Sequence, residues 1–134
     1  TSVVDHCEEN GLQTIPVNNA TKSFALDRTG KLRFVNTRSE NYWALRDALD
    51  PGNQDSWIAL PPDPELKADL CSATWTLKAN GVQIESKDDI IKRIKRSPDK
   101  GDALILANMT TIKLEDWPEE YNGSNDSKSS VTGY

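Results

Sequence analysis

The chain has 134 residues, of which 36% are hydrophobic and 28% charged, and its formal net charge is −5. This length supports one domain at most, with little core material. The negative charge argues against a protein that coats nucleic acid indiscriminately, because neutralising phosphates takes concentrated lysine and arginine. No apolar run approaches the length of a membrane span.

The cysteines and the first residue add two expectations. Cys7 and Cys71 lie far apart in the sequence and show no CxxC spacing, so we expect reduced thiols. The chain contains a single histidine, so we also expect no zinc site. The chain begins at Thr1 without a methionine, which indicates a piece of a longer polypeptide.

The first third of the chain is predicted to hold a helix, a strand end and a polar surface excursion. Residues 2–10 carry apolar side chains at helical spacing, and Gly11 follows as a helix-ending residue. Residues 12–17 alternate as a strand does, but Pro16 cannot donate to a ladder, which predicts an edge or a strand end. Residues 18–36 are polar, with a turn and then a short strand near their end.

A second helix is predicted after Thr37-Arg38-Ser39-Glu40, which reads as a capping box. Its apolar side carries Tyr42, Trp43, Leu45 and Leu49, and Pro51-Gly52 ends it. An aromatic side chain within an apolar helical stripe is typical of core packing. Stacking of Trp43 on a nucleic-acid base is the alternative.

A short helix and a hairpin are predicted next. Pro64 marks the first turn of a helix over residues 65–71. Two β-rich runs, residues 74–78 and 82–84, are joined at Ala79-Asn80-Gly81, and Asn-Gly is a strong hairpin signal. The polar side of this hairpin is a candidate to approach DNA, although solvated strand faces usually look the same.

The stretch over residues 85–107 carries the chemistry. Ser86, with Asp89 three positions on, predicts the start of a basic helix that runs to about Arg96. Ser97-Pro98 then opens a second helix, predicted to be almost wholly apolar and buried, with its acidic end at the rim of the core.

Asp99 and Asp102 lie at the start of that second helix. Their i, i+3 spacing puts them on one face, about 5–6 Å apart at Cβ, which allows them to share a cation or to serve a pair of cations. The alternative is that both simply complement the helix dipole or cap its first turn.

Positive charge is concentrated beside these two acids. The predicted DNA-binding residues are Lys87, Lys92, Arg93, Arg96 and Lys100, with Lys95 adding to the same charge. Such a set suits a phosphate backbone held without sequence readout. A solvated helix face is the alternative, and Ile90, Ile91 and Ile94 are expected to bury one side of this helix.

The chain resembles the C-terminal end of the nuclease domain of tailed-bacteriophage large terminase subunits. The segments that carry this resemblance are residues 84–87 and 96–107, together with residues 42–49 and 59–66. The resemblance covers about residues 1–108. It implies the C-terminal portion of a ribonuclease H-like fold of the α/β class, an α+β fragment with helices on a small mixed sheet and a β-hairpin. In that pattern the first two metal-binding carboxylates of the family fall before Thr1.

The same resemblance implies a metal-dependent DNA endonuclease in the intact subunit, with Mg²⁺ or Mn²⁺ held by two-metal chemistry. Asp102 matches the third acid of the family and Asp99 is its neighbour one turn away. The implied task is the cutting of concatemeric viral DNA during packaging in the host cytoplasm. The implied partners are double-stranded DNA, the terminase small subunit and the portal protein, and no membrane contact is implied. We expect the isolated chain to be inactive.

The alternative is a non-catalytic module that docks on DNA or portal protein, or a prophage remnant. In either case residues 1–109 are predicted as the nuclease-like part and residues 110–134 as an acidic, then Ser/Asn/Gly-rich tail that buries too little apolar area to order itself.

Overall fold

The computed structural model describes residues 2–53 and 58–109, and the predicted tail over residues 110–134 lies outside them. The described residues fall into two units, residues 2–17 and the remainder from residue 18 onward. Together they hold five helices and one two-stranded antiparallel hairpin. This mixed content of helix and strand confirms the predicted α+β class, but the sheet of the described residues is the antiparallel hairpin alone and not the predicted mixed sheet.

The first unit contains helix α1, Val3–Glu9. Ser2 and Asp5 form a capping box, in which the Ser2 Oγ accepts from the Asp5 N–H at 3.1 Å and an Asp5 carboxylate oxygen accepts from the Ser2 N–H at 2.8 Å. Gly11 follows with φ 73°, which confirms the predicted helix end. The predicted strand at residues 12–17 was wrong, because an extended segment becomes a strand only by pairing and none of the described residues pairs with it.

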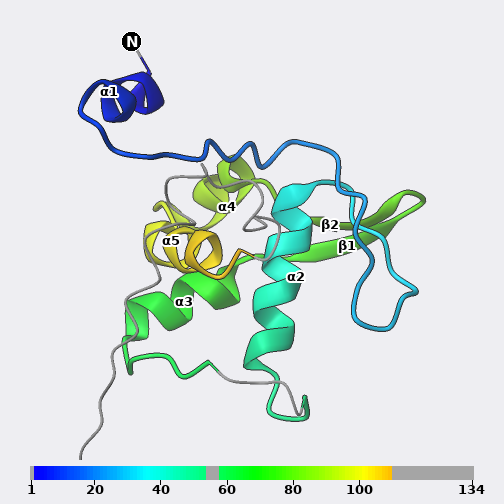
Figure 1. Cartoon of the computed structure of the whole chain (residues 1–134). Coiled ribbons are helices and arrows are strands. Elements are labelled where there is room, and N and C mark those ends of the chain that lie inside the picture. Colours follow the sequence, from blue (N-terminus) through cyan, green and yellow to red (C-terminus); the bar gives the residue numbers. More distant parts are fainter. Residues whose placement is uncertain (1, 54–57, 110–134) are drawn as a thin grey trace, which may run out of the picture. The chain divides into compact units, whose positions relative to one another are not determined.

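Helix α2, Thr37–Leu49, opens the larger unit (Figure 1). Its N-cap is Asn36, whose side-chain oxygen accepts from the Ser39 N–H at 2.9 Å. The predicted capping box was therefore misplaced by one residue. Glu40 instead accepts a hydrogen bond from the Ser23 hydroxyl at 2.6 Å, which ties the preceding polar segment to the helix.

Strands β1, Trp75–Lys78, and β2, Gly81–Ile84, form the predicted hairpin, with Trp75 opposite Ile84 and Lys78 opposite Gly81. On its other side β2 touches the polar segment through a parallel bridge between Val82 and Phe34. The predicted short strand at residues 31–35 is thus reduced to isolated bridges, because the contact with β2 extends over too few residues to form a ladder.

The core of this unit lies where the hairpin meets α2. Phe34, Trp43 and Val82 form a buried cluster, with Ala25 and Leu32 packed against it. The ring centroids of Phe34 and Trp43 are 6.3 Å apart. Trp43 therefore packs in the core, as the helical stripe predicts.

Three further helices complete the unit: α3, Pro64–Ser72, α4, Lys87–Ile94, and α5, Asp99–Ala107. Helix α4 has the predicted Ser86 cap but ends before the predicted Arg96. Lys95 adopts φ 62°, and a left-handed residue ends a helix. Figure 1 shows α3 and α5 next to each other, and α5 also contacts α2.

Helix α5 is less buried than its sequence predicts. Gly101 and Ile105 are buried, whereas Leu106 is 46% exposed and Ala103 and Ala107 are exposed as well. Within the described part of the chain α2 and α3 cover one side of α5, so the prediction of an almost wholly buried helix was wrong.

Two other expectations concern the cysteines and the membrane. Cys7 and Cys71 are both free thiols. Among the described residues, the structure contains no helix with the length and apolar character that crossing a membrane requires.

Candidate functional site

Asp102 lies in the first turn of α5 with its side chain 18% exposed, at the meeting point of three polar side chains. The Tyr42 hydroxyl donates to its Oδ1 at 3.1 Å, and the Arg38 guanidinium lies 3.5 Å from the same oxygen. The Lys87 Nζ lies 2.9 Å from the other oxygen, Oδ2. An ionised carboxylate at this position has cationic partners on both oxygens.

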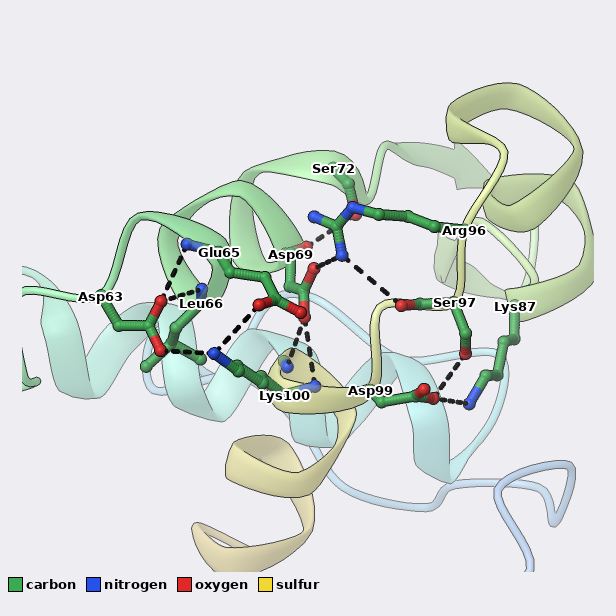
Figure 2. Close-up of polar contacts among 11 residues, drawn as sticks. Asp63, Glu65, Leu66, Asp69, Ser72, Lys87, Arg96, Ser97, Asp99 and Lys100 are labelled. Carbon is green, nitrogen blue, oxygen red and sulfur yellow. Dashed lines mark hydrogen bonds and ion pairs between the residues drawn. The ribbon is translucent and has the colours of Figure 1, made fainter.

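Asp99 is the outer member of the predicted pair, with its side chain 76% exposed. The Lys87 Nζ lies 3.1 Å from Asp99 Oδ1, so one ammonium joins both aspartates. Figure 2 shows Lys87 and Ser97 pointing at the Asp99 carboxylate. The Ser97 hydroxyl, and after it Lys87, hold the pKa of Asp99 below its usual value. The bond to Asp102 is the main reason that the pKa of Lys87 is raised.

The start of α5 is fixed by Asp69, a fully buried carboxylate from α3. Its Oδ2 accepts from the backbone N–H groups of Lys100 and Gly101, at 3.1 and 3.2 Å, and its Oδ1 pairs with the Arg96 guanidinium (Figure 2). These two N–H groups have no partner within their own helix. Asp69 therefore caps α5 from another element and fixes the direction in which Asp99 and Asp102 leave the backbone.

A cavity of about 470 Å³ opens beside Asp102. Arg38, Tyr42, Lys87 and Asp102 line it, together with Gln83 of β2 and Ile105 of α5. Burial, only partly opposed by Arg38, raises the pKa of Tyr42 to about 12, so its hydroxyl stays protonated and donates to Asp102 at neutral pH. The site is a recess with one carboxylate, Asp102, in its lining, and the second, Asp99, contacts the lining residue Lys87 from outside.

Comparison with known proteins yields one relevant structure. The chain is similar to the nuclease domain of the large terminase subunit gp2 of bacterial virus Sf6, with a TM-score of 0.50 and 21% sequence identity. The chain thus shares part of the fold of a terminase nuclease domain. The match covers 70% of this chain and 52% of that structure, so the chain spans about half its length. A scan of protein-family models and a search of curated proteins gave no match.

The terminase-type fold raises the question of whether a divalent cation fits this site. Carboxylate oxygens are the ligands that Mg²⁺ prefers, and Asp99 and Asp102 already converge on one positive group, the Lys87 ammonium. Within residues 2–53 and 58–109, no group of three or more His, Cys, Asp or Glu side chains is placed to hold a metal ion. Two carboxylates alone supply fewer oxygen ligands than a divalent cation takes, so a cation held by Asp99 and Asp102 would need further ligands.

The five predicted DNA-binding cations each form an ion pair with a carboxylate. Lys92 lies 3.6 Å from Asp89, and Arg93 lies 2.6 Å from Glu85. Lys87 pairs with both Asp99 and Asp102, and Arg96 pairs with Asp69. Lys100 pairs with Asp63 and Glu65. Their positive charge is thus largely balanced locally, and the α4 to α5 surface is less basic than its sequence alone indicates.

Sequence reasoning missed Arg38 and Tyr42 as neighbours of Asp102. Arg38 is held by a hydrogen bond from its Nε to the Glu85 carbonyl at 3.2 Å, and its guanidinium carbon lies 4.7 Å from the Tyr42 ring centroid. One signal was available in the sequence, since a tyrosine within an apolar stripe needs a partner for its buried hydroxyl. That signal does not name Asp102, which lies sixty positions away.

Proposed function

We propose that this chain is the C-terminal part of the nuclease domain of a phage large terminase subunit, and that the intact domain cuts concatemeric viral DNA by two-metal hydrolysis during genome packaging. The observation that carries the proposal is the Asp102 site on a terminase-type fold. A partly buried carboxylate there faces a recess while its one-turn neighbour, Asp99, shares the same cation.

Each side chain of the recess has a distinct task in this proposal. Asp102 is the inner oxygen ligand for a divalent cation and Asp99 the outer one. Arg38 and Tyr42 keep the Asp102 carboxylate oriented, because both contact its Oδ1. Without a metal ion, the Lys87 ammonium balances the negative charge of the two carboxylates. With a metal ion bound, Lys87 would become free to contact a phosphate of the substrate. When bound, Mg²⁺ or Mn²⁺ would stabilise the charge that develops on the attacking and leaving oxygens.

The remaining ligands are proposed to come from polypeptide outside this chain. The chain spans about half of the terminase structure that it matches, and the described residues offer Asp102 in the recess and Asp99 on the same Lys87 ammonium. A pair of divalent cations requires more oxygen ligands than two side chains supply. We therefore expect the isolated chain to lack nuclease activity with Mg²⁺ or Mn²⁺, and reproducible plasmid nicking by pure material would contradict this.

The decisive experiment is plasmid cleavage by the full-length parent protein carrying Asp102→Asn. This variant keeps the size of the side chain and removes the charge that a cation needs, so cleavage should fall by at least two orders of magnitude. The matched control is Asp89→Asn, since Asp89 is also in the first turn of a helix but does not line the recess. Normal cutting by the Asp102 variant would refute the proposed function.

A non-catalytic module that docks on DNA or portal protein is the second candidate. For such a module, the local pairing of all five predicted DNA-binding cations with acids favours a protein partner over DNA. The reading frame upstream of Thr1 separates the two candidates. Acidic residues on strands and an ATPase domain encoded upstream of Thr1 would support the nuclease. Its proposed partners are then the small subunit and the portal protein, in the host cytoplasm. A start codon at the position of Thr1 would support the non-catalytic module.

A further inference from the structure

One face of the segment over residues 22–33 is both cationic and aromatic. Its side chains alternate, so that Ser23 and Ala25 turn inward while Lys22, Phe24 and Leu26 are exposed. Phe24 is 87% exposed, so nearly the whole ring is open to a ligand. An antiparallel bridge between Leu26 and Arg33 brings the exposed Arg33 to the same face.

The same segment forms one wall of a groove of about 710 Å³. The other wall is the turn of the hairpin, with Ala79 and Asn80, and Figure 1 shows the segment looping beside the hairpin tip. Lys22, Phe24 and Arg33 line the groove, and none of its lining residues is acidic. The volume lies in the range of small-ligand sites. We call this feature the Phe24 groove.

The cations of the groove differ from those of α4 and α5. Within the described part of the chain, Lys22 and Arg33 form no ion pair with a carboxylate, and the same holds for the neighbouring exposed Lys31. All five cations predicted to bind DNA are paired with acids. In a chain of net charge −5, the Phe24 groove therefore gathers positive charge that is free to meet an anion.

The walls of the groove are held in place by backbone contacts. The Arg33 carbonyl accepts from the Val82 N–H at 2.8 Å, and a Cβ at Gly81, where φ is 128°, would lie 2.3 Å from that same carbonyl oxygen. On the other side, Ser23 is anchored through its hydroxyl to Glu40. The exposed side chains thus project from a preformed frame, which reduces the ordering cost of binding.

Proteins bind single-stranded nucleic acid with exposed aromatic rings that lie beside cations free of carboxylate partners. The ring stacks on a base, and the cations contact the phosphates on either side. The Lys22 ammonium already lies 5.4 Å from the Phe24 ring centroid, so ring and charge are adjacent. Bases in a duplex are stacked on one another and offer no free face, which favours single strands over double strands.

We propose that the Phe24 groove binds single-stranded nucleic acid, with Phe24 stacking on a base and Lys22 and Arg33 holding the adjacent phosphates. This site goes beyond the proposed nuclease function, because it requires neither a metal ion nor Asp102. It would hold an unpaired strand on the same unit as the Asp102 recess, at a place where none of the predicted site residues lies.

The test is fluorescence anisotropy of labelled oligo(dT), about 12 nucleotides long, with the 134-residue chain at low salt and with EDTA present. Phe24→Ala should weaken binding by about 5- to 150-fold, the equivalent of losing one stacked base, whereas Phe24→Trp should retain it. Because Phe24 is almost fully exposed, neither substitution removes core packing. Circular dichroism confirms that each variant is folded.

A matched pair of charge variants separates the groove from net charge. Arg33→Ala should weaken binding and reduce its salt dependence, whereas Lys95→Ala, which removes an exposed cation that does not line the groove, should not. Asp102→Asn should bind as the wild type does, so the groove is tested independently of nuclease activity.

Three outcomes would overturn the proposal. The first is equal affinity of the wild type and Phe24→Ala, and the second is no binding of any oligonucleotide at low salt. The third is equal or tighter binding of a duplex or of an acidic phosphopeptide of the same charge, which would mean that the groove selects charge and not unpaired bases.

Discussion

The Asp69 carboxylate of α3 accepts a hydrogen bond from the backbone N–H of Gly101 in α5, at 3.2 Å. The two helices approach so closely there that a Cβ at position 101 would lie 2.9 Å from the Asp69 Cβ. This contact explains a glycine within the first turns of a helix, where glycine costs about 1 kcal/mol relative to alanine. It also fixes the helix that carries Asp99 and Asp102.

Gly101→Ala should therefore destabilise the protein, against the usual effect of that substitution in a helix. Overpacking costs about 1–3 kcal/mol and the gain in helix propensity returns about 1, so we expect a net loss of about 1 kcal/mol in the free energy of unfolding. Urea denaturation measures it. The control is Ala103→Gly at an exposed position of α5, which should show the propensity effect alone. A Gly101→Ala protein more stable than the wild type would contradict the close approach.

The local parts of this site were predictable from sequence and the long-range parts were not. Ser86 caps α4, and Asn80-Gly81 marks the turn of the hairpin. Both effects involve residues close together in the sequence, so a short sequence pattern predicts them. Asp69 reaches Gly101 across thirty-two positions and Tyr42 reaches Asp102 across sixty, and no local pattern records such contacts. The strand predicted from alternation in residues 12–17 failed for the same reason, since pairing depends on a distant partner.

Glu85 should make stability depend on pH in the acid range. The hydrogen bond from Arg93 lowers the pKa of Glu85 from 4.5 to about 2, so its contribution is complete above about pH 4.5 and is lost as pH falls toward 2. The unfolding free energy, measured in urea at several pH values, should fall across that window. Glu85→Gln should flatten the decline, whereas Asp88→Asn, which removes an acid from the nearby first turn of α4, should not. Parallel pH profiles for wild type and Glu85→Gln would contradict the pairing.

The titration of Asp99 should report which neighbours hold it. The Ser97 hydroxyl is the larger cause of the lowered pKa of Asp99 and Lys87 the next. Ser97→Ala and Lys87→Gln should each raise that pKa, whereas Lys92→Gln should leave it unchanged because Lys92 pairs with Asp89. Carboxyl carbon NMR follows the titration directly. An Asp99 pKa unchanged in both the Ser97 and Lys87 variants would show that these contacts do not form in solution.

The central claim, that Asp99 and Asp102 form part of a divalent-cation site, is tested most directly by paramagnetic broadening with Mn²⁺. Substoichiometric Mn²⁺ is added to the isotope-labelled chain, and the NMR signals of all its carboxylates are compared. The account predicts that the carboxylate signals of Asp99 and Asp102 broaden first, and that Asp102→Asn abolishes this preference. Broadening that is uniform over the acids, or centred on Asp88 and Asp89 at the start of α4, would contradict it.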